Sequence, residues 1–191
     1  MMSGLLIALV LVAQASAAEP AAPEPLDPAP ILDALDLSGE EVAFTETRAS
    51  GLLSEPLEVQ GLLRREAEDR LVRETTTPSE ETQILGADFV ELRRANGHRR
   101  RFSLDRAPEL AALRSVLLAL LDGQASRLED RFEISARGGD EAWTLELRPR
   151  DPQLAERVTR LLLGGQASRL DSLTLQLSDG DEILTRFDPD R

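Results

Sequence analysis

Short runs of alternating apolar and polar residues, separated by turn sequences, limit what this chain can fold into. In residues 143–148 (WTLELR) every second residue is apolar, and the same spacing joins Leu173, Leu175 and Leu177. A strand with this period has one apolar and one polar face. The connections between the runs are short and rich in turn-forming residues, as in residues 95–97 (ANG). We therefore expect an antiparallel sheet built from hairpins.

The same pattern gives the positions of the expected strands. They cover residues 41–47, 56–63, 70–76, 87–94, 100–104, 127–135, 141–148, 171–178 and 182–187. Residues 154–163 (LAERVTRLLL) are compatible with a helix or a strand. The glycine pair that follows them favours a strand and a hairpin turn.

One segment is predicted to be a long helix. Residues 107–123 (APELAALRSVLLALLDG) begin with Pro108, which suits a first turn, and end with Gly123, which suits a C-terminal cap. Their leucines form a wide apolar stripe, so this helix should lie against the apolar face of the sheet. A short helix is expected within residues 31–38. The predicted fold class is α+β, dominated by an antiparallel sheet.

The hexapeptide GQASRL occurs twice, at residues 123–128 and 165–170. The first copy leaves the predicted helix and enters the strand around Phe132. The second copy is expected to turn one strand into the next. Two copies are too few for a repeat architecture, so turn chemistry explains them better than a shared active motif.

The beginning of the chain has the pattern of an export signal. Residues 1–17 contain a nine-residue apolar run and end in ASA, a small-residue cleavage site. We expect cleavage after Ala17, a disordered Pro/Ala-rich leader at residues 18–30, and one domain at residues 31–188. The absence of cysteine excludes disulfides. The interpretation is a soluble periplasmic protein, expected to be a monomer.

Charge and composition exclude several classes of partner. The formal net charge of −13 argues against nucleic acid and anionic membrane surfaces as general partners. Aromatic residues make up 3% of the chain, which disfavours sites that bind sugars or stack bases on aromatic faces.

The sequence contains no recognisable motif for covalent chemistry. His98 is the sole histidine and lies in a predicted hairpin turn, without a nucleophile pattern around it. The carboxylates near Glu66 and near Asp179 lack the spacing of a calcium loop. With one histidine and no cysteine, a catalytic metal is disfavoured. We expect no enzyme activity, no cofactor and no metal.

An arginine-rich hairpin is the clearest surface feature. Arg93, Arg94, Arg99, Arg100 and Arg101 flank the predicted turn and form a basic tip on an acidic protein. Such a tip suits an acidic partner or a lipid phosphate. Solvated arginines on polar strand faces are the simpler alternative.

The order of features resembles the LolA-like family of periplasmic outer-membrane lipoprotein carriers. After the export signal come F-x-E-x-R (residues 44–48), LLSEPL (52–57), GLL (61–63), DRL (69–71) and TP (77–78). The predicted helix follows, and then WTLELRP (143–149) and DGD (179–181) ahead of TRF (185–187). The resemblance extends from about Ile31 to Phe187.

This resemblance implies a fold and an activity. The family fold is an antiparallel sheet curved into an incomplete barrel, with helices covering its concave face. Family members shield the acyl chains of lipoproteins between sheet and helices, and carry them from an inner-membrane transporter to an outer-membrane receptor. From strand parity and from the apolar stripe of the predicted helix we expect a lipid-binding groove lined by Leu57, Val59, Leu63, Leu113, Leu117, Leu121, Trp143, Leu145 and Leu147. The same residues would also suit an ordinary closed core.

This chain departs from the family pattern at one position that matters for opening. The resemblance implies an Arg-Pro step after the glycine that matches Gly61, and that arginine ties the sheet to the helical lid. Here the segment reads Glu66-Ala67-Glu68, with Arg64, Arg65 and Arg70 as possible substitutes. This departure indicates a divergent paralogue, whose cargo is a lipoprotein or a lipid conjugate. The alternative function is an envelope sensor or adaptor that binds a protein through the same half-barrel.

Overall fold

The fold is one large antiparallel sheet that curves around a helix. The computed structural model describes residues 25–35, 41–67, 69–139 and 142–188. Within them the sheet has 12 strands in the order β1-β8-β9-β10-β11-β12-β2-β3-β4-β5-β6-β7. The strands are β1 (Pro25–Leu26), β2 (Val42–Ala49), β3 (Leu57–Ala67), β4 (Arg70–Thr77), β5 (Glu81–Leu85), β6 (Phe89–Arg94), β7 (Arg99–Ser103), β8 (Phe132–Gly138), β9 (Trp143–Pro149), β10 (Val158–Gln166), β11 (Arg169–Leu177) and β12 (Glu182–Asp188).

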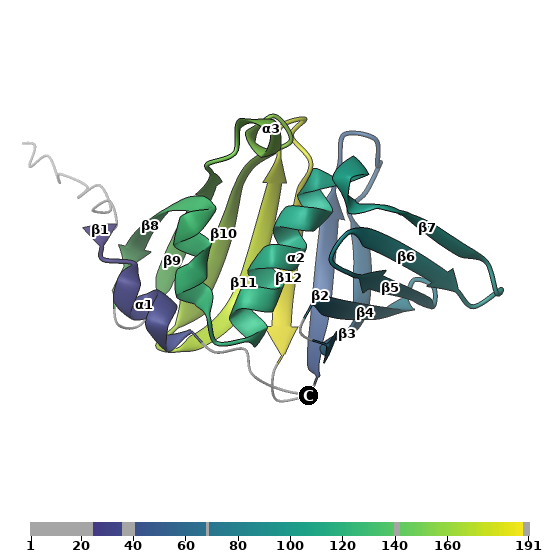
Figure 1. Ribbon diagram of the computed structural model, residues 1–191, viewed down its shortest axis with the longest axis horizontal. Helices are drawn as coiled ribbons and strands as arrows, with labels where there is room; N and C mark the ends of the chain where they lie inside the picture. The colour runs from purple at the N-terminus through teal and green to yellow at the C-terminus, as the bar shows by residue number, and fades with distance from the viewer. Residues whose placement is uncertain (1–24, 36–40, 68, 140–141, 189–191) are drawn as a thin grey trace, which may run out of the picture.

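Sequence neighbours pair as antiparallel hairpins along most of the sheet. The exceptions are β12 with β2 and β1 with β8, which are also antiparallel. The pairing of β12 with β2 places the last strand beside one of the first, in the middle of the sheet (Figure 1). The strands β1 and β7 form the two edges. The predicted antiparallel sheet and its α+β class are confirmed.

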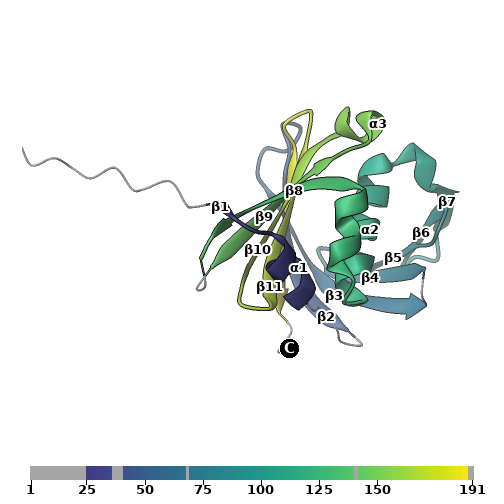
Figure 2. The same cartoon turned by 60° about the vertical axis from the view of Figure 1, so that its left-hand side comes forward.

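The helices all lie on the concave side of the curved sheet (Figure 2). They are α1 (Ala29–Ala34), α2 (Pro108–Leu121) and α3 (Pro152–Ala155), with two 3₁₀ turns, η1 (Leu104–Arg106) and η2 (Ala125–Asp130). The helix α2 is the predicted long helix. It begins at Pro108 and is followed by Gly123 with φ 61°. Leu113, Val116, Leu117, Leu120 and Leu121 are buried, so the apolar stripe faces the sheet as expected.

Three local predictions differ from the structure. The strand β5 was not expected, because the segment ETQIL is mostly polar. Residues 127–130 were expected to begin a strand but belong to η2, and β8 starts at Phe132. The expected disordered leader ended at Pro30, whereas Pro25–Leu26 pairs with β8 and α1 starts at Ala29. The predicted export signal lies outside the described residues.

The ambiguous segment before the second GQASRL is a strand. It forms β10, and the second copy turns β10 into β11 through Ala167, with φ 49°. Gly165 lies opposite Trp143 on β9, and a Cβ at this glycine would overlap the indole ring. The indole Nε1 donates a hydrogen bond to the carbonyl of Ala167 at 2.8 Å. The first copy instead leads from α2 into η2, so the two copies adopt different structures.

Candidate functional site

The concave face of the sheet and α2 enclose an apolar space. Leu113 and Leu117 of α2 meet Leu63 on β3, and the rest of the boundary is Phe44, Glu46, Arg73, Leu173, Thr185 and Phe187. The remaining cavity is about 10 Å³, near the minimum that holds one water molecule. In this conformation the protein's own side chains fill the space beneath α2.

The residues expected to line a groove share this enclosed face, with one exception. Those that are buried are Val59, Leu63, Leu113, Leu117, Leu121, Trp143, Leu145 and Leu147. Leu57 is different: it is 37% exposed, at the first position of β3. Of the expected set, Leu63, Leu113 and Leu117 border the cavity. The remaining buried members belong to the same continuous hydrophobic cluster.

A buried ion pair lies on the sheet beneath α2. Glu46 and Arg73 are 1% and 5% exposed, and Nη2 of Arg73 lies 2.8 Å from Oε2 of Glu46. The same carboxylate accepts hydrogen bonds from Nε of Arg48 at 2.6 Å and from Oγ1 of Thr185 at 3.2 Å. Arg73 also lies 4.6 Å from the centre of the Phe44 ring. All these partners come from the sheet, while α2 covers the pair with leucines.

Arg73 is a charged group held away from water. Removal from water lowers the pKa of the Arg73 guanidinium, and the nearby Glu46 carboxylate offsets part of that effect. A buried charge needs a counter-charge and hydrogen bonds to persist, and this one has both. The pair is therefore a polar centre that the fold maintains inside an otherwise apolar face.

The sequence contains a signal for this pair that the interpretation of its motifs missed. Phe44 and Glu46 share one parity on β2, as Leu71 and Arg73 do on β4. Alternation therefore puts both charges on the same face as buried apolar residues. The motif F-x-E-x-R contributes to the family resemblance. Its glutamate, Glu46, is two residues after Phe44, so strand alternation puts Glu46 on the same inward face as Phe44.

Hydrogen bonds from arginines hold the sides of α2 to the sheet. Nη1 of Arg65 on β3 is paired with the carboxylate of Asp122, directly after α2. Arg114 of α2 donates to the carbonyls of Leu85 and Asp69. Burial lowers the pKa of Arg114, and Asp69 opposes that shift. Arg64 and Arg70 instead pair with Glu66. Arg65 is thus the one of the three suggested substitutes that reaches the helix.

We expect Arg65→Ala to loosen the end of α2 with little loss of stability. The ion pair is partly exposed, so its removal should lower the free energy of unfolding by about 1 kcal/mol or less. Amide hydrogen exchange in the last turn of α2 should become faster, because Asp122 loses its link to β3. Arg64→Ala is the matched control and should leave exchange in α2 unchanged. Equal rates of amide exchange in the last turn of α2 in both variants would contradict a role for Arg65 in holding α2 against the sheet.

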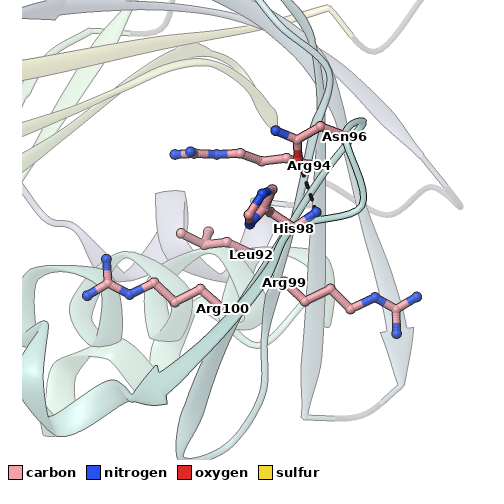
Figure 3. A pocket seen from close by; sticks show the side chains of 6 residues that line it. All are labelled: Leu92, Arg94, Asn96, His98, Arg99 and Arg100. Carbon is pink, nitrogen blue, oxygen red and sulfur yellow. Dashed lines mark hydrogen bonds between the residues drawn. The ribbon is translucent and has the colours of Figure 1, made fainter.

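The predicted basic hairpin is formed by β6 and β7, and its arginines point to both faces of the sheet. Leu92 lies opposite Arg100, and Arg93 lies opposite Arg99. Strand alternation therefore puts Arg94 and Arg100 on the concave face, and Arg93, Arg99 and Arg101 on the convex face. Figure 3 shows Arg94 and Arg100 extending to one side of the hairpin and Arg99 to the other. The arginines do gather at the hairpin as expected, but they form two separate basic surfaces, one on each face of the sheet.

The single histidine lies in the turn between β6 and β7. His98 is exposed in the turn, where its backbone N–H donates to the side chain of Asn96 at 3.1 Å. Among the described residues, no group of three His, Asp or Glu side chains could hold a metal ion. Within the same residues, none of the helices has the length and apolarity needed to cross a membrane.

The fold and the enclosed face define a half-barrel with a helical cover. The family described as "Outer membrane lipoprotein carrier protein LolA-like" matches residues 20–186. This range covers most of the chain, so the protein belongs to the LolA-like family. A comparison with curated proteins found no match.

The solved structures that this chain is similar to share little of its sequence. A LolA superfamily protein from Nitrosomonas europaea has 10% identity and a TM-score of 0.44, covering 82% of this chain and 88% of that one. LprF from Mycobacterium bovis has 12% identity and a TM-score of 0.37, covering 82% and 86%. The MucA/MucB complex from Pseudomonas aeruginosa has 13% identity and a TM-score of 0.38, covering 83% and 53%.

Proposed function

We propose that this protein is a periplasmic carrier that shields the acyl chains of a lipoprotein or lipid conjugate between the sheet and α2. The observation that carries the proposal is the way α2 is attached. At the cavity it presents the apolar side chains of Leu113 and Leu117 to the sheet, and the polar group beneath them is satisfied by sheet residues. Membership of the LolA-like family supports the same activity.

Loading requires α2 to move, because the closed cavity is far too small for an acyl chain. When the helix lifts, leucine side chains leave the apolar face of the sheet and an acyl chain takes their place. Each methylene buried in this way contributes about 0.8 kcal/mol. The exchange replaces one apolar contact with another, so the free energy of opening is recovered on binding.

The proposed route runs between the two membranes. The export signal at residues 1–17 is cleaved after Ala17, and a leader precedes the carrier domain, which begins no later than β1. An inner-membrane transporter supplies the acylated cargo, and an outer-membrane receptor accepts it. The transfer needs no covalent step and no cofactor.

Bound lipid provides the direct test. We expect protein purified from its own periplasm to carry co-purifying acylated material, measured by native mass spectrometry under non-denaturing conditions. After delipidation, the protein should take up an offered saturated fatty acid in a 1:1 complex. Protein that is empty on isolation and binds no offered acyl chain would contradict the carrier function.

The basic hairpin supports a second candidate, an envelope adaptor that binds an acidic protein. β7 is an edge strand with exposed backbone groups and three consecutive arginines, Arg99, Arg100 and Arg101. Charged edge strands also protect a sheet from unwanted pairing, which is a structural role without a partner. A variant with all three arginines changed to glutamine should lose partner capture and keep uptake of an uncharged lipid if the adaptor function holds.

A further inference from the structure

The concave side of the β6–β7 hairpin contains a pocket that is separate from the cavity under α2. Its volume is about 460 Å³, and it is lined by Leu92, Arg94, Asn96, His98, Arg99 and Arg100 (Figure 3). The turn is fixed by a hydrogen bond from the N–H of Gly97 to the carbonyl of Arg94 at 2.9 Å. The pocket is large enough for a polar headgroup, whereas the cavity beneath α2 is nearly closed.

The charges that line this pocket are incompletely neutralised. Arg94 donates to Glu81 at 3.0 Å. Burial favours a raised pKa for the Glu81 carboxyl, but hydrogen bonds from Gln83 and Arg94 outweigh it and hold the pKa below its usual value. The guanidinium of Arg100 lies 6.0 Å from the centre of the Phe102 ring. Within the described part of the chain, Arg100 has no carboxylate at ion-pair distance, and the guanidinium of Arg99 extends to the other side of the hairpin (Figure 3).

A row of apolar side chains leads from this pocket to the core beneath α2. Phe102 on β7 lies opposite Val90, Val90 lies opposite Leu85, and Leu85 lies opposite Leu71. These four residues share the concave face, and Leu71 and Leu85 belong to the main hydrophobic cluster. Neighbouring strands are about 4.8 Å apart, so the row is about 15 Å long. Val90, Leu85 and Leu71 are buried, so an acyl chain reaches this row only when the elements that cover it move.

A polar row runs beside the apolar one. Leu92 lies opposite Gln83, and Gln83 lies opposite Arg73. Hydrogen bonds connect Arg94 to Glu81 at 3.0 Å, Gln83 to Glu81 at 3.0 Å, and Arg73 to Gln83 at 3.4 Å. Through these bonds the pocket is continuous with the buried ion pair. The β6 side of the pocket therefore lies about two strand spacings, or about 10 Å, from Arg73 on β4.

We propose that the cargo is an anionic amphiphile whose headgroup binds in this pocket while its acyl chain follows the apolar row to α2. Arginine forks suit phosphate and carboxylate oxygens, and Leu92 and Phe102 suit the first methylenes of the chain. The net charge of −13 repels an anionic headgroup from most of the surface, so such a headgroup is expected to bind where cationic side chains gather. The proposal rests on the carrier function proposed above and specifies its substrate class.

The test compares two lipids that differ in charge and have the same acyl chains. Delipidated full-length protein is mixed with phosphatidylglycerol or with diacylglycerol, and bound lipid is counted by native mass spectrometry. We expect phosphatidylglycerol to bind about 10-fold more tightly. The double variant Arg94→Gln/Arg100→Gln should reduce that preference to about 2-fold or less, while binding of diacylglycerol is unchanged.

The matched control is the double variant Arg93→Gln/Arg101→Gln, which removes the same charge from the convex face of the hairpin. It should keep the full preference for phosphatidylglycerol. An equal loss in both double variants would overturn the proposal, because it would indicate a general charge effect. Equal binding of the two lipids by wild-type protein would also overturn it but would leave the carrier function standing. If neither lipid binds, the carrier function itself fails.

Two further probes separate other occupants of the pocket. Glycerol 3-phosphate carries the anionic group without acyl chains and should bind at least about 10-fold more weakly than phosphatidylglycerol. A polyglutamate peptide represents an acidic protein partner. Binding of this peptide through Arg94 and Arg100, together with no preference between the lipids, would overturn the proposal in favour of the adaptor function.

Discussion

Replacing Glu46 with leucine is expected to lower the free energy of unfolding by about 3–5 kcal/mol. The substitution leaves the guanidinium of Arg73 buried without a counter-charge. Its remaining contacts would be Gln83 at 3.4 Å and the ring of Phe44. Arg48 and Thr185 would also lose their shared acceptor. Urea unfolding followed by circular dichroism measures the loss.

The double variant Glu46→Leu/Arg73→Met should recover most or all of that loss. Removing both charges replaces an ion pair with apolar contacts of similar volume, which is often neutral or stabilising. The exposed pair of Arg169 and Asp171, at 2.7 Å, is the control. Asp171→Leu should lower the free energy of unfolding by about 1 kcal/mol or less. A double variant as unstable as Glu46→Leu alone would contradict this account of the pair.

The double variant Glu46→Leu/Arg73→Met also tests how the buried ion pair affects the opening of α2. Enclosure by the leucines of α2 keeps water from Arg73 and Glu46, so lifting the helix returns water to them. The buried pair therefore reduces the stability of the closed state relative to the open one. The double variant should therefore take up lipid more slowly than the natural protein.

The sheet could be predicted from sequence because its strands have a period of two and are separated by turn residues. The segment containing Trp143, Leu145 and Leu147 is β9, and all three side chains are buried. The strand β5 was not predicted because Glu81 and Gln83 occupy inward positions, where a one-sided strand normally has apolar residues. Those positions belong to the polar row, so the irregularity in the pattern marks the candidate site.

The state of the site could not be predicted from strand parity. Parity assigns a residue to a face, and the same leucines line an open groove or fill a closed core. Leu63, Leu113 and Leu117 are on the expected face, but the cavity between them is only about 10 Å³. The arginine hairpin shows the same limit. The arginine cluster was evident from the sequence. Its division between two faces depends on the pairing register of β6 and β7, which puts Arg94 and Arg100 on one face and Arg93, Arg99 and Arg101 on the other.

Leu117→Ala is expected to turn the small cavity into a binding site while lowering the free energy of unfolding by about 2–5 kcal/mol. Leu117 is 3% exposed and borders the space between α2 and the sheet. Truncation removes buried apolar atoms and leaves a cavity next to Phe44 and Leu63. If an acyl chain occupies this space in the loaded protein, a fatty acid should fill the cavity. At a free concentration of 100 times its Kd, the fatty acid should restore about 2.7 kcal/mol.

Leu32→Ala is the control that separates a carrier groove from an ordinary core. Leu32 is 1% exposed and lies on α1, another helix that covers the sheet, so its truncation should be similarly destabilising. Both variants are unfolded in urea with and without the fatty acid, and the gain in stability is compared. Rescue should be greater for Leu117→Ala than for Leu32→Ala. Equal rescue, or none in either variant, would mean that the leucines beneath α2 are core residues and that acyl chains bind elsewhere or not at all.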